Sequence, residues 1–159
     1  MCWIETLRNV KYQVADKDIK VYKIVKCADT QSCVSIIQNF NYAVNTLYKV
    51  STLEYATVNR RPGVIKIEKA YHSYTGIQFV CDSVSTARDY AFNMGNRISR
   101  CKYILSGNIK MYIPLESYYY IATFIIPKGA TYVINRCGEI VSDKIMYTGK
   151  YLKLWKKYY

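Results

Sequence analysis

The sequence predicts an α+β fold, in which residues 1–159 form a single domain with a mostly antiparallel sheet and one helix packed on it. The 159 residues are enough for one domain with a hydrophobic core, and 51% of them are hydrophobic, which argues against disorder. Short runs of β-branched and aromatic residues recur between turn residues, as in strands joined by tight turns. One stretch has the three-and-four spacing of a helix.

The first third of the chain contains one clear strand. Ala15–Asp18 predicts a surface turn, and Lys20–Lys26 then alternates polar and apolar residues as a half-buried strand does. Residues 33–50 have a mixed pattern, in which the first part is compatible with a short helix and the part from Tyr42 onward with a strand. Both alternatives stay open.

The middle of the chain predicts a turn, two short strand-like segments and the helix. Asn59–Gly63 is a turn by composition, Val64–Glu68 resumes the alternation, and Tyr71–Gly76 follows as a strand end or loop. The helix is expected at about residues 83–98, because Ser83 or the aspartate before it can cap it. Apolar residues recur along one face of this helix: Val84, Ala87, Ala91, Met94 and Ile98.

Strands with firm turns dominate the C-terminal half. Ser106-Gly107 is the expected turn of a hairpin, and Pro127–Gly129 must end a strand because proline lacks the N–H donor and glycine permits the reversal. The predicted strands are Lys102–Leu105, Asn108–Ile113, Ser117–Ile126, Thr131–Ile134 and Glu139–Tyr147.

The composition points to anionic partners. The chain carries 23 lysines and arginines against 11 acidic residues, a net charge of +12, and it contains 18 tyrosines. Such a field attracts nucleic acid, nucleotides, acidic protein surfaces and anionic membranes, and the attraction weakens with salt. Tyrosine suits half-buried strand surfaces, because the ring packs while the hydroxyl finds water or a partner.

The cysteines predict a reducing, cytoplasmic setting with free thiols, which is the host cytoplasm if a phage encodes the protein. None of the six forms a Cys-x-x-Cys pair and the chain has one histidine, so we expect no metal site and no cofactor. The first residues do not form an apolar signal segment, and no apolar run is long enough to cross a bilayer.

Basic residues form the candidate anion-binding sites. They are Arg60, Arg61, Arg97, Arg100, Lys102, Lys153, Lys156 and Lys157. The C-terminal segment 150–159 interleaves cations with aromatic rings, as proteins that grip phosphates and stack on bases do. The same segment is compatible with a short helix packed through Tyr151 and Trp155, with a lysine-protected edge strand, or with binding to a membrane surface.

Several motifs, in order along the chain, resemble a family of small proteins of gut Bacteroidota and their phages. They are Met1-Cys2, Asp18–Val25, Tyr71-His-Ser-Tyr74, Ile125–Tyr132 and Gly138–Ile145. The resemblance implies a bacterial or bacteriophage source, and by association a phage accessory role; it implies no activity.

The order of elements also resembles that of ADP-ribosyltransferase-like domains. In that comparison Tyr22-Lys23 occupies the place of a strand arginine, Ser73-Tyr74 the second element, and Glu139 the position that leads the late strand. Lysine cannot make the bidentate contact of arginine, and Glu139 has no second acid beside it. If the chain is an enzyme, the residues to test are Tyr22, His72, Tyr74 and Glu139.

The leading hypothesis is a non-enzymatic binding protein that holds an anionic ligand or an acidic protein partner through a basic, tyrosine-rich face. One alternative is an ADP-ribosyltransferase-like or nucleotide-handling enzyme, which a pocket joining His72 to Glu139 would favour. Another alternative is a nucleic-acid-binding protein, whose affinity falls steeply with salt. The oligomeric state is left open.

Overall fold

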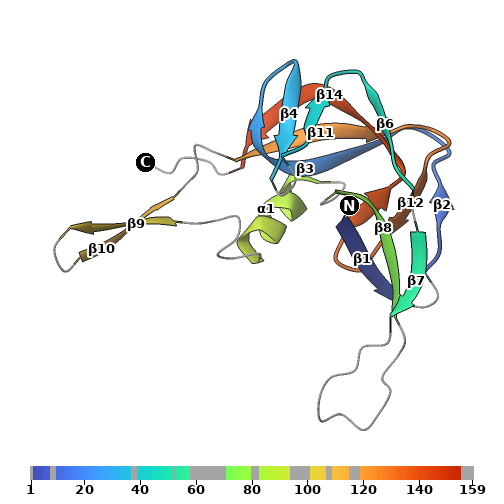
Figure 1. The fold of residues 1–159 in the computed structure, drawn as a ribbon, viewed down its shortest axis with the longest axis horizontal. Coiled ribbons are helices and arrows are strands. Elements are labelled where there is room, and N and C mark those ends of the chain that lie inside the picture. The colour runs from blue at the N-terminus through green and yellow to red at the C-terminus, as the bar shows by residue number, and fades with distance from the viewer. Residues whose placement is uncertain are drawn as a thin grey trace, which may run out of the picture.

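The computed structural model describes residues 2–7, 10–36, 39–51, 53–57, 71–79, 83–93, 101–106, 109–114 and 119–154 (Figure 1). These residues form mostly antiparallel sheet with one short helix, as the sequence predicts. The strands are β1 (Cys2–Leu7), β2 (Gln13–Val14), β3 (Ile19–Ala28), β4 (Ser32–Ser35), β5 (Asn41–Ala43), β6 (Leu47–Lys49), β7 (Leu53–Thr57), β8 (Tyr71–Phe79), β9 (Cys101–Ser106), β10 (Ile109–Pro114), β11 (Tyr120–Ile126), β12 (Thr131–Ile134), β13 (Ile140–Ser142) and β14 (Lys144–Lys153), and the helix is α1 (Val84–Asn93).

One six-stranded sheet, which we call the curled sheet, has the order β5-β4-β3-β11-β14-β6 with antiparallel neighbours. Its two ends meet, because Val44 directly after β5 forms a bridge with Tyr147 of β14. The Asn45 N–H also donates a hydrogen bond to the Tyr147 carbonyl at 3.0 Å. Figure 1 shows these strands wrapping over one another at the top of the molecule.

A second sheet has the order β1-β8-β13-β12-β2, with β7 also paired to β8. It joins the curled sheet at Asp143, between β13 and β14. There the Asp143 carboxylate accepts the Thr131 N–H at 2.9 Å and the Ser142 hydroxyl donates to the Thr131 carbonyl at 3.1 Å. The prediction of a single strand over Glu139–Tyr147 is therefore wrong. The strand is interrupted at Asp143, where the chain passes from one sheet to the other.

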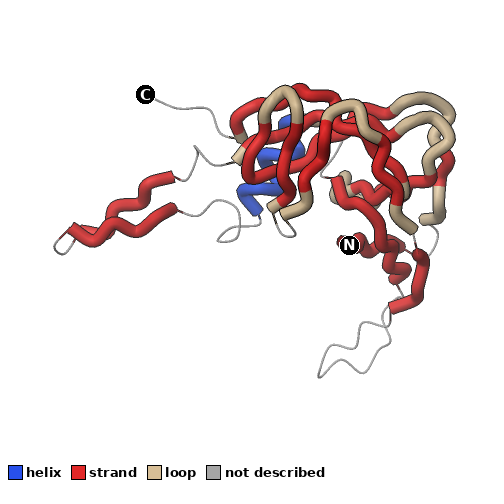
Figure 2. The backbone as a smooth tube through the Cα atoms, turned by 45° about the horizontal axis from the view of Figure 1, so that its top comes forward, coloured by secondary structure: helices blue, strands red, loops and turns tan. Residues whose placement is uncertain are grey.

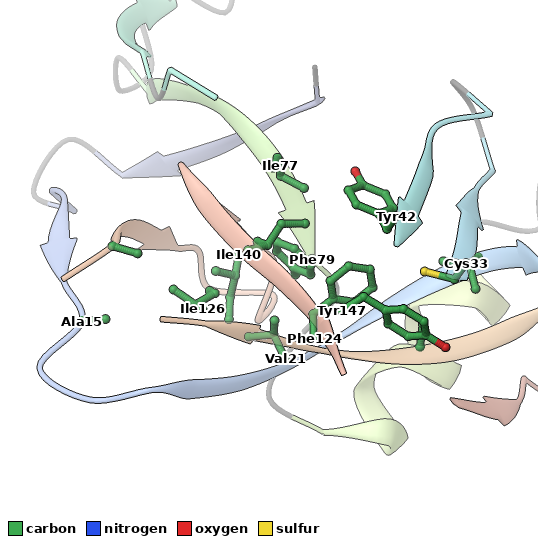
Figure 3. Close-up of a cluster of buried hydrophobic side chains, with 14 residues drawn as sticks. Ala15, Val21, Cys33, Tyr42, Ile77, Phe79, Phe124, Ile126, Ile140 and Tyr147 are labelled. Atoms are coloured by element: carbon green, nitrogen blue, oxygen red, sulfur yellow. The ribbon is translucent and has the colours of Figure 1, made fainter. Parts of the chain in front are cut away.

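The main core fills the inside of the curled sheet and is closed by the second sheet. Figure 3 shows Phe79 of β8 reaching toward Phe124 and Tyr147, with Tyr42 and Cys33 beside them. The rings of Phe79 and Phe124 lie 5.5 Å apart, and those of Phe124 and Tyr147 5.3 Å apart. Aromatic contacts of this kind add to the stabilisation that comes from burying the rings.

The outer face of the curled sheet carries the helix, and Figure 2 shows α1 against these strands. The Ser83 hydroxyl caps the helix by accepting the Thr86 N–H at 3.2 Å. Ala87 is fully buried in a cluster with Ile24 and Ile121, since a small side chain lets the helix approach the sheet. The described helix covers ten residues, and positions 94–98 of the predicted span lie outside the described residues.

Several local predictions are confirmed. Lys20–Lys26 lies within β3, the hairpin around Ser106-Gly107 is the β9–β10 pair, and Gly129 ends its strand with a φ of +86°. The open segment 33–50 contains most of β4 and all of β5 and β6, joined by turns, and no helix among its described residues. The predicted turn Asn59–Gly63 and the strand after it lie outside the described residues, as does the start of the strand predicted from Ser117.

Candidate functional site

Most of the predicted anion-binding residues lie outside the described part of the chain. These are Arg60, Arg61, Arg97, Arg100, Lys156 and Lys157. The backbone of Lys102 lies in β9. Lys153 is described in full and is exposed at the end of β14. Lys150–Lys153, the start of the basic C-terminal segment, therefore forms a strand.

The two candidate tyrosines lie in different clusters. Tyr74 is fully buried, its hydroxyl donates to the Val10 carbonyl at 2.8 Å, and its ring contacts that of Tyr12 at 5.0 Å. Tyr22 is half-buried on the helix side of β3, where it packs against the cluster around Ile24. These contacts give both tyrosines a role in packing.

His72 and Glu139 lie near opposite ends of β8. His72 pairs with Thr6, whereas the residue that follows Glu139 pairs with Phe79. At about 3.3 Å per residue, the two backbone positions are about 20 Å or more apart along the strand. This separation is too large for two side chains that must both reach one reacting group.

The Glu139 carboxylate has a local partner. It accepts a hydrogen bond from the Asn135 amide at 3.4 Å, and the Glu139 N–H donates to the Asn135 side chain at 2.9 Å. These two contacts close the turn between β12 and β13, in which Gly138 has a φ of +80°. Glu139 thus shapes a hairpin.

The residues that the structure does bring together lie on the core side of the curled sheet, at the end of β14. Ala122 of β11 pairs with Lys23 on one side and with Tyr151 on the other. Two residues earlier, Tyr120 pairs with Lys153 on the β14 side. Because directly opposed residues point to the same face and faces repeat every second residue, all these side chains share one face.

We call Lys23, Tyr120, Tyr151 and Lys153 the tyrosine–lysine face. The rings of Tyr120 and Tyr151 meet edge to face with centroids 5.6 Å apart. Tyr151 is 38% exposed and Lys153 is exposed, whereas Tyr120 and Lys23 are half-buried. The face therefore runs from solvent toward the core.

Lys23, like Tyr120, is a member of this face that sequence reasoning did not identify as a binding residue. Its ammonium group lies 5.6 Å from the centre of the Phe79 ring, a favourable position for a cation over an aromatic face. Its neighbours on the same side of β3, Val21 and Val25, are fully buried. The available signal in the sequence was that Lys23 has a valine two residues before it and another two residues after it, all on one face of the strand.

Two weakly acidic groups next to this face stay neutral. Burial raises the pKa of the Cys33 thiol to about 12, although nearby Lys23 acts in the opposite direction. Burial also raises the pKa of the Tyr147 phenol, and Cys33, Asp29 and Tyr151 add to this effect. The Tyr147 hydroxyl donates to the Asp29 carbonyl at 2.8 Å. At neutral pH neither group is a ready nucleophile or base.

The carboxylate of Asp29, which lies near Cys33 and Tyr147, stabilises a turn. Asp29 Oδ1 accepts the backbone N–H groups of Gln31 and Ser32 at 2.7 and 2.8 Å. Among the residues of the described ranges, no group of three histidine, cysteine or acidic side chains is placed to hold a metal ion. No described helix is long and apolar enough to cross a membrane.

The arrangement can bind an anion but offers little for covalent chemistry. It combines lysine ammonium groups with phenol donors and a neutral thiol. Comparisons of this chain with protein-family models, curated proteins and solved structures found no match.

Proposed function

We propose that this protein is a non-enzymatic binding protein that holds an anionic ligand at the tyrosine–lysine face. The observation that carries the proposal is the contact between Tyr120 and Tyr151 on the same face as Lys23 and Lys153. Rigid aromatic side chains supply contact area at low entropic cost, and the lysines supply charge.

The position of the lysines favours anion binding. Lys153 is exposed and can meet a ligand directly, whereas Lys23 is half-buried, where charges are screened less by water and salt. The overall charge of +12 adds a long-range attraction that accelerates encounter with an acidic partner.

The raised pKa values of Cys33 and Tyr147 favour binding over catalysis. Both groups remain protonated near neutral pH, so they present no negative charge to an anion. The separation of His72 from Glu139 along β8 argues against direct acid–base cooperation between these two side chains.

A panel of anions measured by thermal shift and fluorescence titration tests this function. The probes are ATP, a thymidine oligonucleotide, a glutamate-rich peptide and a lysine-rich control peptide, each at low and high salt. A ligand that binds the folded state raises its stability, and its affinity falls with salt.

The key variants are Lys153→Gln and the matched control Lys128→Gln. Lys128 is also exposed, but it lies in the turn beyond the opposite end of β11. We expect the first substitution to weaken binding of the anion about threefold to fivefold and the control to leave it unchanged. No binding of any anion, or equal losses for the two variants, would refute the proposed site.

A further inference from the structure

The last four residues of β14, Lys150–Lys153, form a strand segment that is paired on one edge. Within it, Tyr151–Lys153 pairs with Tyr120–Ala122 of β11, whereas β6 pairs with β14 only at Lys144–Met146. All four residues are exposed, and Leu152 is 50% exposed. Within the described ranges, no strand pairs with the other edge of Lys150–Lys153.

The hydrogen-bond pattern shows which backbone groups this edge presents. The Leu154 N–H donates to the Tyr119 carbonyl at 3.1 Å, directly beyond the end of the ladder. In an antiparallel pair, hydrogen-bonded and non-hydrogen-bonded positions alternate. The backbone N–H and C=O groups of Leu152 therefore bond to β11, whereas those of Tyr151 and Lys153 point to the outer edge.

A partner for this edge must offer both donors and acceptors. A peptide in extended conformation does so, because its own N–H and C=O groups alternate in the same way. A nucleic acid backbone offers acceptors at its phosphates and cannot satisfy the two carbonyls. The edge chemistry thus favours a peptide over an oligonucleotide.

The charges select an acidic peptide and disfavour a second copy of this chain. Two copies would bring net charges of +12 together at this edge, and such like charges repel one another. Side chains alternate between the two faces of a strand, so Lys153 shares a face with Tyr151, and Leu152 lies on the opposite face. A partner strand with acidic residues on one face and apolar residues on the other would meet Lys153 and Leu152 at the same time.

We infer that an extended acidic segment of a partner protein adds as a strand along Lys150–Lys153, with its acidic side chains on Lys153 and its apolar side chains on Leu152. This inference rests on the proposed function and names its partner class. The peptide backbone supplies the hydrogen bonds, and the tyrosine–lysine face supplies charge and ring contacts.

Three fluorescently labelled probes test the inference on the full chain by anisotropy. The first is a peptide of alternating glutamate and valine. The second has the same sequence with N-methyl groups on two adjacent central residues, which removes one N–H from each edge of the strand. The third is a thymidine oligonucleotide of similar charge.

We expect the unmodified peptide to bind and the N-methylated peptide to bind about tenfold more weakly, because edge hydrogen bonds are lost. Lys153→Gln should weaken binding of the unmodified peptide about threefold to fivefold, and Lys128→Gln should leave this binding unchanged.

The other outcomes separate the two proposals. Equal binding of both peptides, with sensitivity to Lys153→Gln, would overturn strand addition while leaving anion binding intact. Binding of the oligonucleotide alone, with the same sensitivity, would also overturn the peptide partner and keep the anion site. If none of the three probes binds, the inference fails, and the anion-binding function fails with it when ATP does not bind either.

Discussion

Substitution of Gly149 by alanine should destabilise the protein much more than the same substitution at Gly129. Both glycines have a positive φ, +80° at Gly149 and +86° at Gly129, so alanine is strained at either position. This strain costs about 1–2 kcal/mol. Their surroundings differ: a Cβ at Gly149 would lie 2.8 Å from the Thr30 carbonyl oxygen and 3.2 Å from a Val44 methyl group, whereas a Cβ at Gly129 meets nothing within 4 Å.

The contact with Thr30 involves a backbone atom and cannot be relieved by a side-chain rotation. Such overpacking costs about 1–3 kcal/mol more, so we expect a loss of about 2–5 kcal/mol for Gly149→Ala and about 1–2 kcal/mol for Gly129→Ala. Urea unfolding followed by circular dichroism gives both free energies, with the wild-type chain as reference. Equal losses would show that Thr30 does not approach Gly149 as described.

Four further predictions concern buried side chains. Leu154→Ala should cost about 2–5 kcal/mol in urea unfolding, because Leu154 is fully buried beneath α1; a loss below 1 kcal/mol would contradict that packing. Tyr74→Phe should cost about 1 kcal/mol through loss of the bond to the Val10 carbonyl, and an unchanged stability would show that this bond contributes nothing. Iodoacetamide at pH 8 should modify Cys33 far more slowly than the exposed Cys27, because burial raises the pKa of Cys33 to about 12; peptide mass spectrometry showing equal rates would refute this. The folded state holds the Cys33 proton more tightly than the unfolded state does. The resulting contribution to the free energy of unfolding is complete below pH 9 and is lost as the pH rises toward 12. A Cys33→Ala variant should lack this pH dependence.

Local patterns in the sequence predicted the strands and turns whose cause is itself local. The alternation of Lys20–Lys26 predicted β3, and Pro127–Gly129 predicted the end of β11, because the dihedral limits of proline and glycine act within the turn. The break at Asp143 was missed because its cause lies outside the segment: the carboxylate bonds to Thr131 on a neighbouring strand.

The candidate site was predicted in part. Composition identified Lys153, since basic and aromatic residues gather near it in the sequence. Lys23 was missed because polar residues of an alternating strand are expected to face water, whereas β3 is covered by the core on one face and by α1 on the other. Both Ile24 and Val25 are consequently buried although they are neighbours in the chain. Only the tertiary arrangement shows such two-sided burial.

The closing of the curled sheet has a consequence for how fast the protein folds. Val44 forms a bridge with Tyr147 of β14, so the closing contact joins segments that are about a hundred residues apart in the sequence. A contact of this separation gains its bonding energy only after a large loop has lost its conformational freedom. We therefore expect refolding on the millisecond-to-second scale typical of sheets with distant partners, with the contact between Val44 and Tyr147 forming late.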